Sequence, residues 1–165
     1  MPTSLTSIES ICPIRMIAGV GDLTYIPLQT IHSAGEYYTI ISDTGQILLS
    51  ASGTWLRMPY MIDTASHSVT KEDSLQGPVY HHALSGFLPY WSPAVVSEMN
   101  KMSRMRFVAV VAMPGQAMNV FVGNTESGAV FDFDRQSGEA PGQRSGIQFS
   151  FTWDNGDGIL YNVPV

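Results

Sequence analysis

The sequence contains only one cysteine, Cys12, among its 165 residues. One thiol cannot form an internal disulfide, and no second cysteine stands at Cys-x-x-Cys spacing, so a disulfide framework and a cysteine-rich zinc site are both excluded. We expect Cys12 to be a buried or unreactive thiol. A Gly-x-Ser-x-Gly elbow, a phosphate loop and a dinucleotide fingerprint are also missing. We therefore predict no enzyme activity, no catalytic residue, no cofactor and no bound metal.

Charge is scarce as well. Charged residues make up 13 % of the chain, against about one quarter in an average soluble protein. The formal net charge is −6, and the basic residues are scattered, with only Arg104 and Arg106 close together. Non-specific binding to nucleic-acid phosphates needs a basic stripe, so we exclude a protein that grips DNA. An acidic balance suits a surface that DNA slides past.

The low charge also bears on association. With 44 % hydrophobic residues, the chain has little charge to solvate its surface, which favours burial of part of that surface against neighbours. A monomer with a surface rich in Ser, Thr and Asn is the alternative. The longest apolar run, 107–113, is too short to span a bilayer, so we expect no membrane contact. Residues 1–10 lack the pattern of a signal peptide, which predicts a protein made in a reducing cytoplasm.

The length is most simply that of one domain. Prolines and glycines interrupt residues 1–22, which we interpret as an N-terminal arm or an irregular strand, with disorder as the alternative. Residues 23–165 form a single β-rich domain in this interpretation. Apolar and β-branched segments predict strands at 24–31, 37–41, 47–51, 55–62, 67–71, 79–84, 105–113, 119–123, 129–134 and 147–153.

The clearest strand is 147–153. Ile147, Phe149, Phe151 and Trp153 alternate with small polar residues, so all four large side chains share one face. That face must be covered by a second sheet, a helix or another subunit. The segment 105–113 is continuously apolar after Arg106, which predicts a strand buried on both faces.

One helix is expected, from about Ser92 to Arg104. Ser92 is a good N-cap and Pro93 fits the first helical position, where its missing N–H costs nothing. Val95, Met99 and Met102 form an apolar stripe at helical spacing. The predicted fold is mainly β, a β-sandwich or a partly closed barrel with this one flanking α-helix.

Several polar clusters are candidates for chemistry. Asp132 and Asp134 are two apart on a strand and should project to the same face, but no further ligand or base lies nearby in sequence. His81 and His82 are adjacent and should point to opposite faces, which excludes joint chelation. Residues 154–158 lack the residue order of a calcium loop, so a glycine-rich turn is the interpretation.

A resemblance to a protein family emerges from motifs within Thr70–Tyr161. The chain resembles small tail or neck structural proteins of phages and prophages from Bacteroidetes-type bacteria, through a pattern of motifs in this order: Thr70-x-Glu72, Gly77-x-x-Tyr80, a helix, the apolar strand 107–113, Gly123, Phe131-x-Phe133, Gly138, Gly146 and Phe149-x-Phe151. The resemblance implies a virion protein, assembled in the host bacterial cytoplasm into a ring or a stack of rings like a tail tube. Its partners would be copies of itself, other tail, neck or portal-proximal proteins, and DNA that passes through without specific binding.

Two functions are expected from these observations. The first is a homo-oligomeric tail or neck protein, in which Asp132 and Asp134 face the lumen. Its candidate subunit contacts are Ile8 and Ile11 in the arm, Trp55 and Tyr60 in the segment 55–60, and Val95 and Met99 on the helix. The alternative is a small β-barrel or sandwich that binds an apolar ligand or a carbohydrate on Trp55, Trp91 and Trp153.

Overall fold

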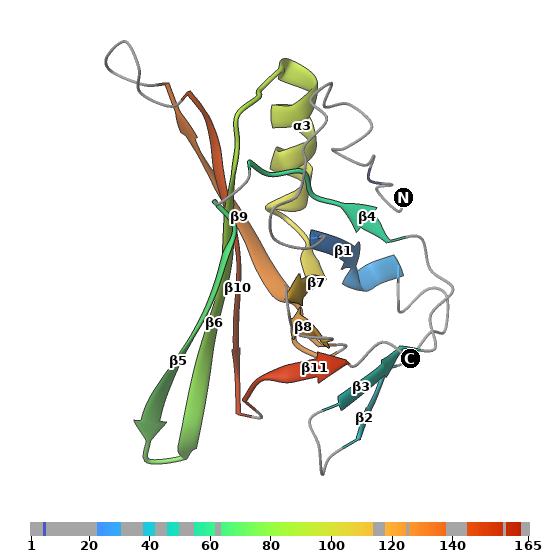
Figure 1. The fold of residues 1–165 in the computed structure, drawn as a ribbon, viewed down its shortest axis with the longest axis vertical. Helices are drawn as coiled ribbons and strands as arrows, with labels where there is room; N and C mark the ends of the chain where they lie inside the picture. The colour runs from blue at the N-terminus through green and yellow to red at the C-terminus, as the bar shows by residue number, and fades with distance from the viewer. Residues whose placement is uncertain are drawn as a thin grey trace.

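The computed structural model describes residues 5, 23–30, 38–41, 46–49, 55–61, 64–113, 118–124, 126–137, 145–156 and 158–162. These residues are mainly β-structure with one ten-residue helix and a short helical turn at 28–30, which confirms the predicted fold class (Figure 1). Most of the predicted arm, including Ile8, Ile11 and Cys12, lies outside them. No helix in these ranges is long and apolar enough to cross a membrane.

Four antiparallel strands form what we call the long sheet. Its strand order is β9–β10–β6–β5. Figure 1 shows this sheet nearly edge-on, with the other strands and the helix on one side of it. The strands span Ser66–Ser74 (β5), Gly77–Leu88 (β6), Ala129–Gln136 (β9) and Gly146–Asn155 (β10).

The remaining strands form a second layer, which β7 connects to the long sheet. Along one edge, β7 pairs first with β9, through Arg106 and Phe107, and then with β8. Along its other edge, β7 pairs with β1. β11 continues from β8 and pairs with the β2–β3 hairpin through β3, and β4 pairs with β1. Their bounds are Leu23–Pro27 (β1), Tyr38–Ile41 (β2), Gln46–Leu49 (β3), Leu56–Arg57 (β4), Arg106–Met113 (β7), Met118–Val122 (β8) and Leu160–Asn162 (β11).

The core lies between these two layers and is dominated by aromatic rings. As predicted, the large side chains of β10 share one buried face, and the chain's own second layer covers that face. Tyr25 of β1 lies 5.9 Å from Phe151, and Phe107 of β7 lies 5.9 Å from the same ring, measured between ring centroids. Each such buried ring stabilises the fold by about 1.5–3 kcal/mol. β7 is buried along its length from Phe107 to Val111, which confirms the prediction of burial on both faces.

The helix α3 spans Pro93–Met102 and begins as predicted. The backbone N–H of Val95 donates to the Ser92 Oγ at 3.2 Å, which satisfies one of the free N–H groups of the first turn. The apolar stripe packs into the core, where Val95, Met99 and Met102 are fully buried. The strands predicted at 37–41 and 47–51 are also present, as β2 paired with β3 in a hairpin.

Two predicted strands differ from those observed. The strand expected at 24–31 ends at Pro27, and residues 28–30 are helical, because a proline has no N–H to extend the ladder. The strand expected at 55–62 is reduced to Leu56–Arg57, because Pro59 interrupts the ladder shortly after it.

The β5–β6 hairpin is much longer than predicted. We expected a loop at 72–78, but both strands continue to a two-residue turn at Leu75 and Gln76. The last residue pair between β10 and β6 is Asn155 with Tyr80, so no described strand lies beside the end of the hairpin. Both of its faces are exposed there, which is why this segment shows no hydrophobic alternation.

Candidate functional site

The face of the long sheet that points away from the second layer is largely exposed, and we call it the open face. Its upper end is the exception, because Phe87 there is 4 % exposed. It consists of alternate side chains of the four strands: 66–74 on β5, 79–87 on β6, 130–136 on β9 and 146–154 on β10, counted every second residue. Most of these side chains are small and polar. They include the carboxylates Glu72, Asp132, Asp134 and Asp154, one histidine, and no Lys or Arg.

The centre of the open face is a row of short polar residues. Ser66, Ser85, Ser150 and Asp132 lie side by side across the four strands. The Oγ atoms of Ser66 and Ser85 are 3.0 Å apart and hydrogen-bonded. Asp132 and Asp134 are both on this face, which confirms that they project to the same side. Arg135 is adjacent to Asp134 but alternates to the inner side of the sheet. Arg106 of β7, opposite Val130, borders the open face and lines a shallow pocket with Val130, Thr152 and Asp154.

A charged cluster crosses the lower part of the open face. His81 Nδ1 lies 2.7 Å from Asp154 Oδ1, and His81 Nε2 lies 3.2 Å from Glu72 Oε2. The hydrogen bond to Asp154, followed by that to Glu72, raises the pKa of His81. The two carboxylates bind opposite nitrogens of the ring, so the three groups cannot chelate one ion. They form instead a chain of hydrogen bonds that ties β5, β6 and β10 together, with ion pairs whenever His81 is protonated.

His82 points to the inner face, as the strand period predicts. It is 1 % exposed and lies against the Trp153 ring, with 5.2 Å between centroids. Its Nε2–H donates to the Gly158 carbonyl at 3.1 Å, so Nδ1 accepts from His67 Nε2–H at 3.4 Å. Burial lowers the pKa of His82, and burial together with the nearby His82 lowers the pKa of His67 to about 4. This pair is therefore neutral at pH 7 and anchors the loop after β10.

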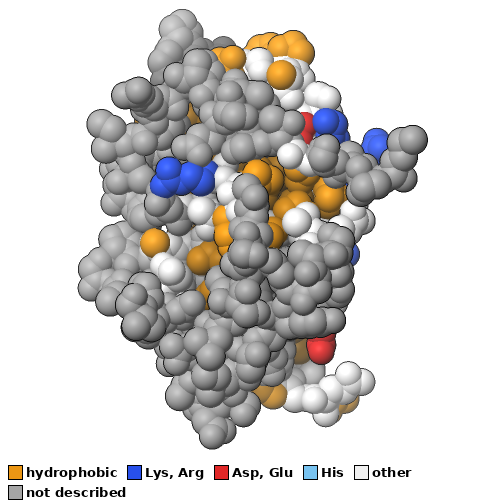
Figure 2. Space-filling view, turned by 90° about the vertical axis from the view of Figure 1, so that its right-hand side faces the viewer, with side chains coloured by type: hydrophobic (Ala, Val, Ile, Leu, Met, Phe, Trp, Pro, Cys, Tyr) orange, Lys and Arg blue, Asp and Glu red, His pale blue; other side chains and the backbone are white. Residues whose placement is uncertain are grey.

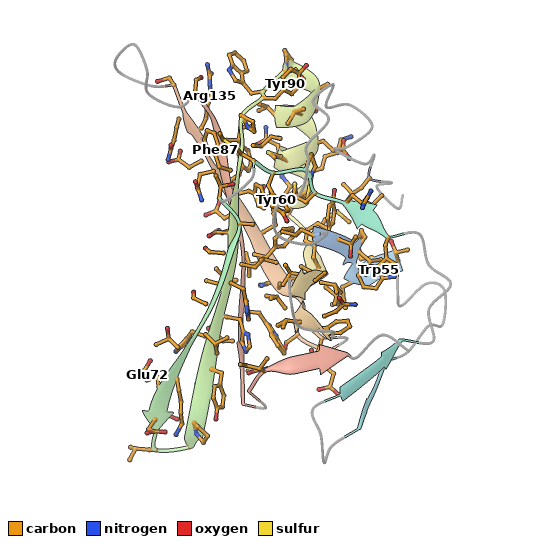
Figure 3. The ribbon with its side chains drawn as sticks, in the orientation of Figure 1. Trp55, Tyr60, Glu72, Phe87, Tyr90 and Arg135 are labelled. Atoms are coloured by element: carbon orange, nitrogen blue, oxygen red, sulfur yellow. The ribbon has the colours of Figure 1, made fainter. Side chains whose placement is uncertain are left out.

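The predicted subunit contacts are placed mostly in the interior. Tyr60, Val95 and Met99 are 3 %, 0 % and 0 % exposed, which corrects their assignment as contacts, because the chain's own core already covers them. Trp55 is half-buried against that core, on the side of the second layer (Figure 3). Ile8 and Ile11 lie outside the described residues.

The three tryptophans do not share a surface. Trp153 is buried and donates its Nε1–H to Ser127 Oγ at 2.9 Å. Trp91 is 42 % exposed and stacks against Arg135, whose Cζ lies 3.8 Å from the ring centroid. Arg135 is level with Ile147 on β10, six residues from Trp153, or about 20 Å along the strand. A single ligand platform of these rings is not formed.

The described part of the chain offers little for catalysis or metal binding. No group of three or more His, Cys, Asp or Glu side chains in it could hold a metal ion. A pocket of about 340 Å³ beside α3 is lined by Gln29, Ser97, Asn100, Lys101, Arg104 and Met105. These side chains provide hydrogen bonds and positive charge, but they do not pair a nucleophile with a base.

Each edge of the long sheet lacks a neighbouring strand over most of its length among the described residues. On the side of β5 away from β6, no described strand pairs with it, and residues 131–136 of β9 lack a described partner opposite β10. Sequence reasoning missed this edge. The alternation of Ser66, Ser68 and Thr70 with His67 and Val69 is the sequence pattern that could have indicated an exposed strand at this edge.

Comparison with known proteins gives no relative, since no protein-family model, curated protein or solved structure matches the chain.

Proposed function

We propose that the protein is a non-enzymatic structural subunit that joins copies of itself through the two edges of the long sheet, with the open face lining a central passage. More specifically, we propose a phage tail or neck protein that forms a ring or tube around the DNA path. The observation that supports it most is the combination of an uncovered acidic face with an open strand on each side of it.

The topology favours joining of the edges. The sheet has an even number of alternating strands, so β5 of one copy would lie antiparallel to β9 of the next. The alternation of strand direction then continues from copy to copy. Backbone groups at both edges gain hydrogen-bond partners, which is the usual way that exposed edges drive association.

The two edges are offset along the strands. Ser66, the first residue of β5, lies on the same row as Asp132, through Ser85 and Ser150. The free part of β9 extends above this row and β5 extends below it, a stagger of roughly five residues or about 17 Å. Joining staggered edges tilts the strands against the common axis, and closing a sheet into a barrel requires such a tilt.

The charge of the open face fits the passage of DNA. Its four carboxylates face outward without a Lys or Arg among them. Lys and Arg side chains are visible on the opposite side of the molecule (Figure 2). A lumen lined in this way repels phosphates and keeps DNA from adhering to the wall. Asp132 and Asp134 would then be lumen residues.

Oligomeric state and hydrogen exchange test the proposal together. We expect native mass spectrometry and electron microscopy to show rings or tubes. Backbone amides of 66–74 and 131–136 should become protected in the assembly and exchange faster after dilution to monomers. The interior strands β6 and β10 are the control, because they are paired in both states. An oligomer whose two edges still exchange rapidly would place the contact elsewhere. A strict monomer stabilised by an added sugar or apolar ligand would favour a binding module instead.

A further inference from the structure

The two ends of the long sheet carry exposed apolar groups of different chemistry. At the lower end, the β5–β6 hairpin extends three residue pairs beyond β10, roughly 10 Å, into a tip that we define as residues 72–77. Leu75 at this tip is 108 % exposed. At the upper end, Trp91 is 42 % exposed and stacked on Arg135. Figure 3 shows Glu72 and Arg135 at these opposite ends.

The tip is held in one shape by its own hydrogen bonds. Ser74 Oγ donates to the Gly77 carbonyl at 2.7 Å and accepts from the Gln76 N–H at 3.3 Å. Gly77 has φ of +121°, which a side chain would disfavour. None of these contacts uses the Leu75 side chain. A preorganised tip presents this leucine with little entropy left to lose on binding.

The charges of the two ends are complementary. Next to Leu75 stand Glu72 and Asp73, whose side chains are 74 % and 78 % exposed. Asp73 pairs with Lys71 at 2.9 Å and Glu72 lies 3.2 Å from His81 Nε2, and both carboxylates remain accessible from solvent beside these partners. At the other end, the positive guanidinium of Arg135 lies on the indole face of Trp91. An aliphatic side chain can pack on the free part of the indole ring, while the carboxylates approach the arginine.

We propose that the hairpin tip of one copy docks on the Trp91–Arg135 pair of a second copy, so that copies stack head to tail along the strand direction. This inference rests on the proposed function and specifies its axial contact. The contact is heterologous, since different surfaces meet, and such contacts continue without limit unless they close.

A single tip is too small to hold two molecules together. Stable interfaces bury about 800 Å² on each partner, more than a two-residue turn and its neighbours supply. A ring presents one tip for every subunit, and the contacts after the first form at high effective concentration. The axial contact should therefore be weak between monomers and strong between rings.

The test uses two variants that each disable one end. Leu75→Lys, which places a positive charge against Arg135, and Trp91→Glu should each give single rings where the unaltered protein gives stacks, with the concentration for half-stacking raised at least about tenfold. Rings of the Leu75 variant keep the Trp91–Arg135 pair, and rings of the Trp91 variant keep the hairpin tip. When the two kinds of preformed ring are mixed, the intact tips should dock on the intact Trp91–Arg135 pairs. Native mass spectrometry should then show doubled rings and nothing longer.

Matched controls separate this inference from the proposed function. Val130→Glu changes another exposed apolar side chain, 38 % exposed on the open face, and should leave stacking unchanged. Arg135→Glu repeats the disabled upper end without altering the indole. If the Leu75→Lys variant stacks normally, if mixing gives no doubled rings, or if the unaltered protein forms single rings only, the axial contact is refuted while the rings uphold the proposed function. A protein that stays monomeric refutes both.

Discussion

Acidification should weaken the fold through His67, and the size of the effect can be worked out from its environment. Burial and the neighbouring His82 lower the pKa of His67 from 6.5 to about 4. The unfolded chain binds this proton below about pH 6.5, whereas the folded chain binds it only near pH 4. The stabilising contribution is thus complete above about pH 6.5 and is lost as the pH falls toward 4.

Between pH 7.5 and 5.0 this linkage corresponds to a loss of about 2 kcal/mol in the free energy of unfolding. Solvent screening at the partly exposed ring reduces the expected loss to about 1 kcal/mol. The lowered pKa of His82 acts in the same direction. His81 acts in the opposite direction, because its raised pKa makes the folded chain bind a proton more readily than the unfolded chain.

The assay is urea unfolding at pH 7.5 and 5.0 for the unaltered protein and two variants. In His67→Gln the amide can still donate toward His82 but does not titrate, so this variant should lose about 1 kcal/mol less stability on acidification. In His81→Gln the loss should be larger than in the unaltered protein, since the favourable protonation is removed. Equal losses in the unaltered protein and His67→Gln would refute the assignment of His67 as a neutral buried group.

Two further predictions concern the packing at Gly86 and the helix cap at Ser92. Gly86→Ala should destabilise the fold by about 1–3 kcal/mol, because a Cβ there would lie 2.6 Å from Cζ of Phe149. Gly156→Ala is the control, because its Cβ would meet only a carbonyl at 3.9 Å. Thermal unfolding should show little effect of this second substitution. Ser92→Ala should cost about 1 kcal/mol by removing the cap of the Val95 N–H, and Ser92→Asp should restore most of it; an unchanged stability of Ser92→Ala would contradict the capping role.

The elements predicted correctly are those whose signals are local. Alternation in 147–153, an apolar run in 107–113 and the Ser92-Pro93 pair each depend on residues close in sequence, and each appears in the structure. Pairing between distant segments leaves no such signal. Examples are β1 with β7 and β11 with β8, which place the cover over the aromatic face.

The candidate site was predictable only in part, for the same reason. The spacing of Asp132 and Asp134 was sufficient to place them on one face. The cluster around His81 was not predictable, because Asp154 is 73 residues away along the chain and reaches it only through the pairing of β6 with β10. The apolar stripe on α3 predicted burial correctly, but such a stripe does not distinguish the chain's own core from a partner's surface.

The two faces of the long sheet also limit how copies can meet. The inner face is filled by the chain's own aromatic core, so it has nothing to offer a neighbour. The open face carries four of the 14 acidic residues and no Lys or Arg. Two such faces repel each other, which disfavours association face to face, most strongly at low salt. The strand edges and the ends of the sheet are the surfaces that remain, and the edges offer uncharged backbone groups. In the proposed assembly, contacts at the edges and ends would therefore leave the open face in contact with solvent or with a repelled polyanion.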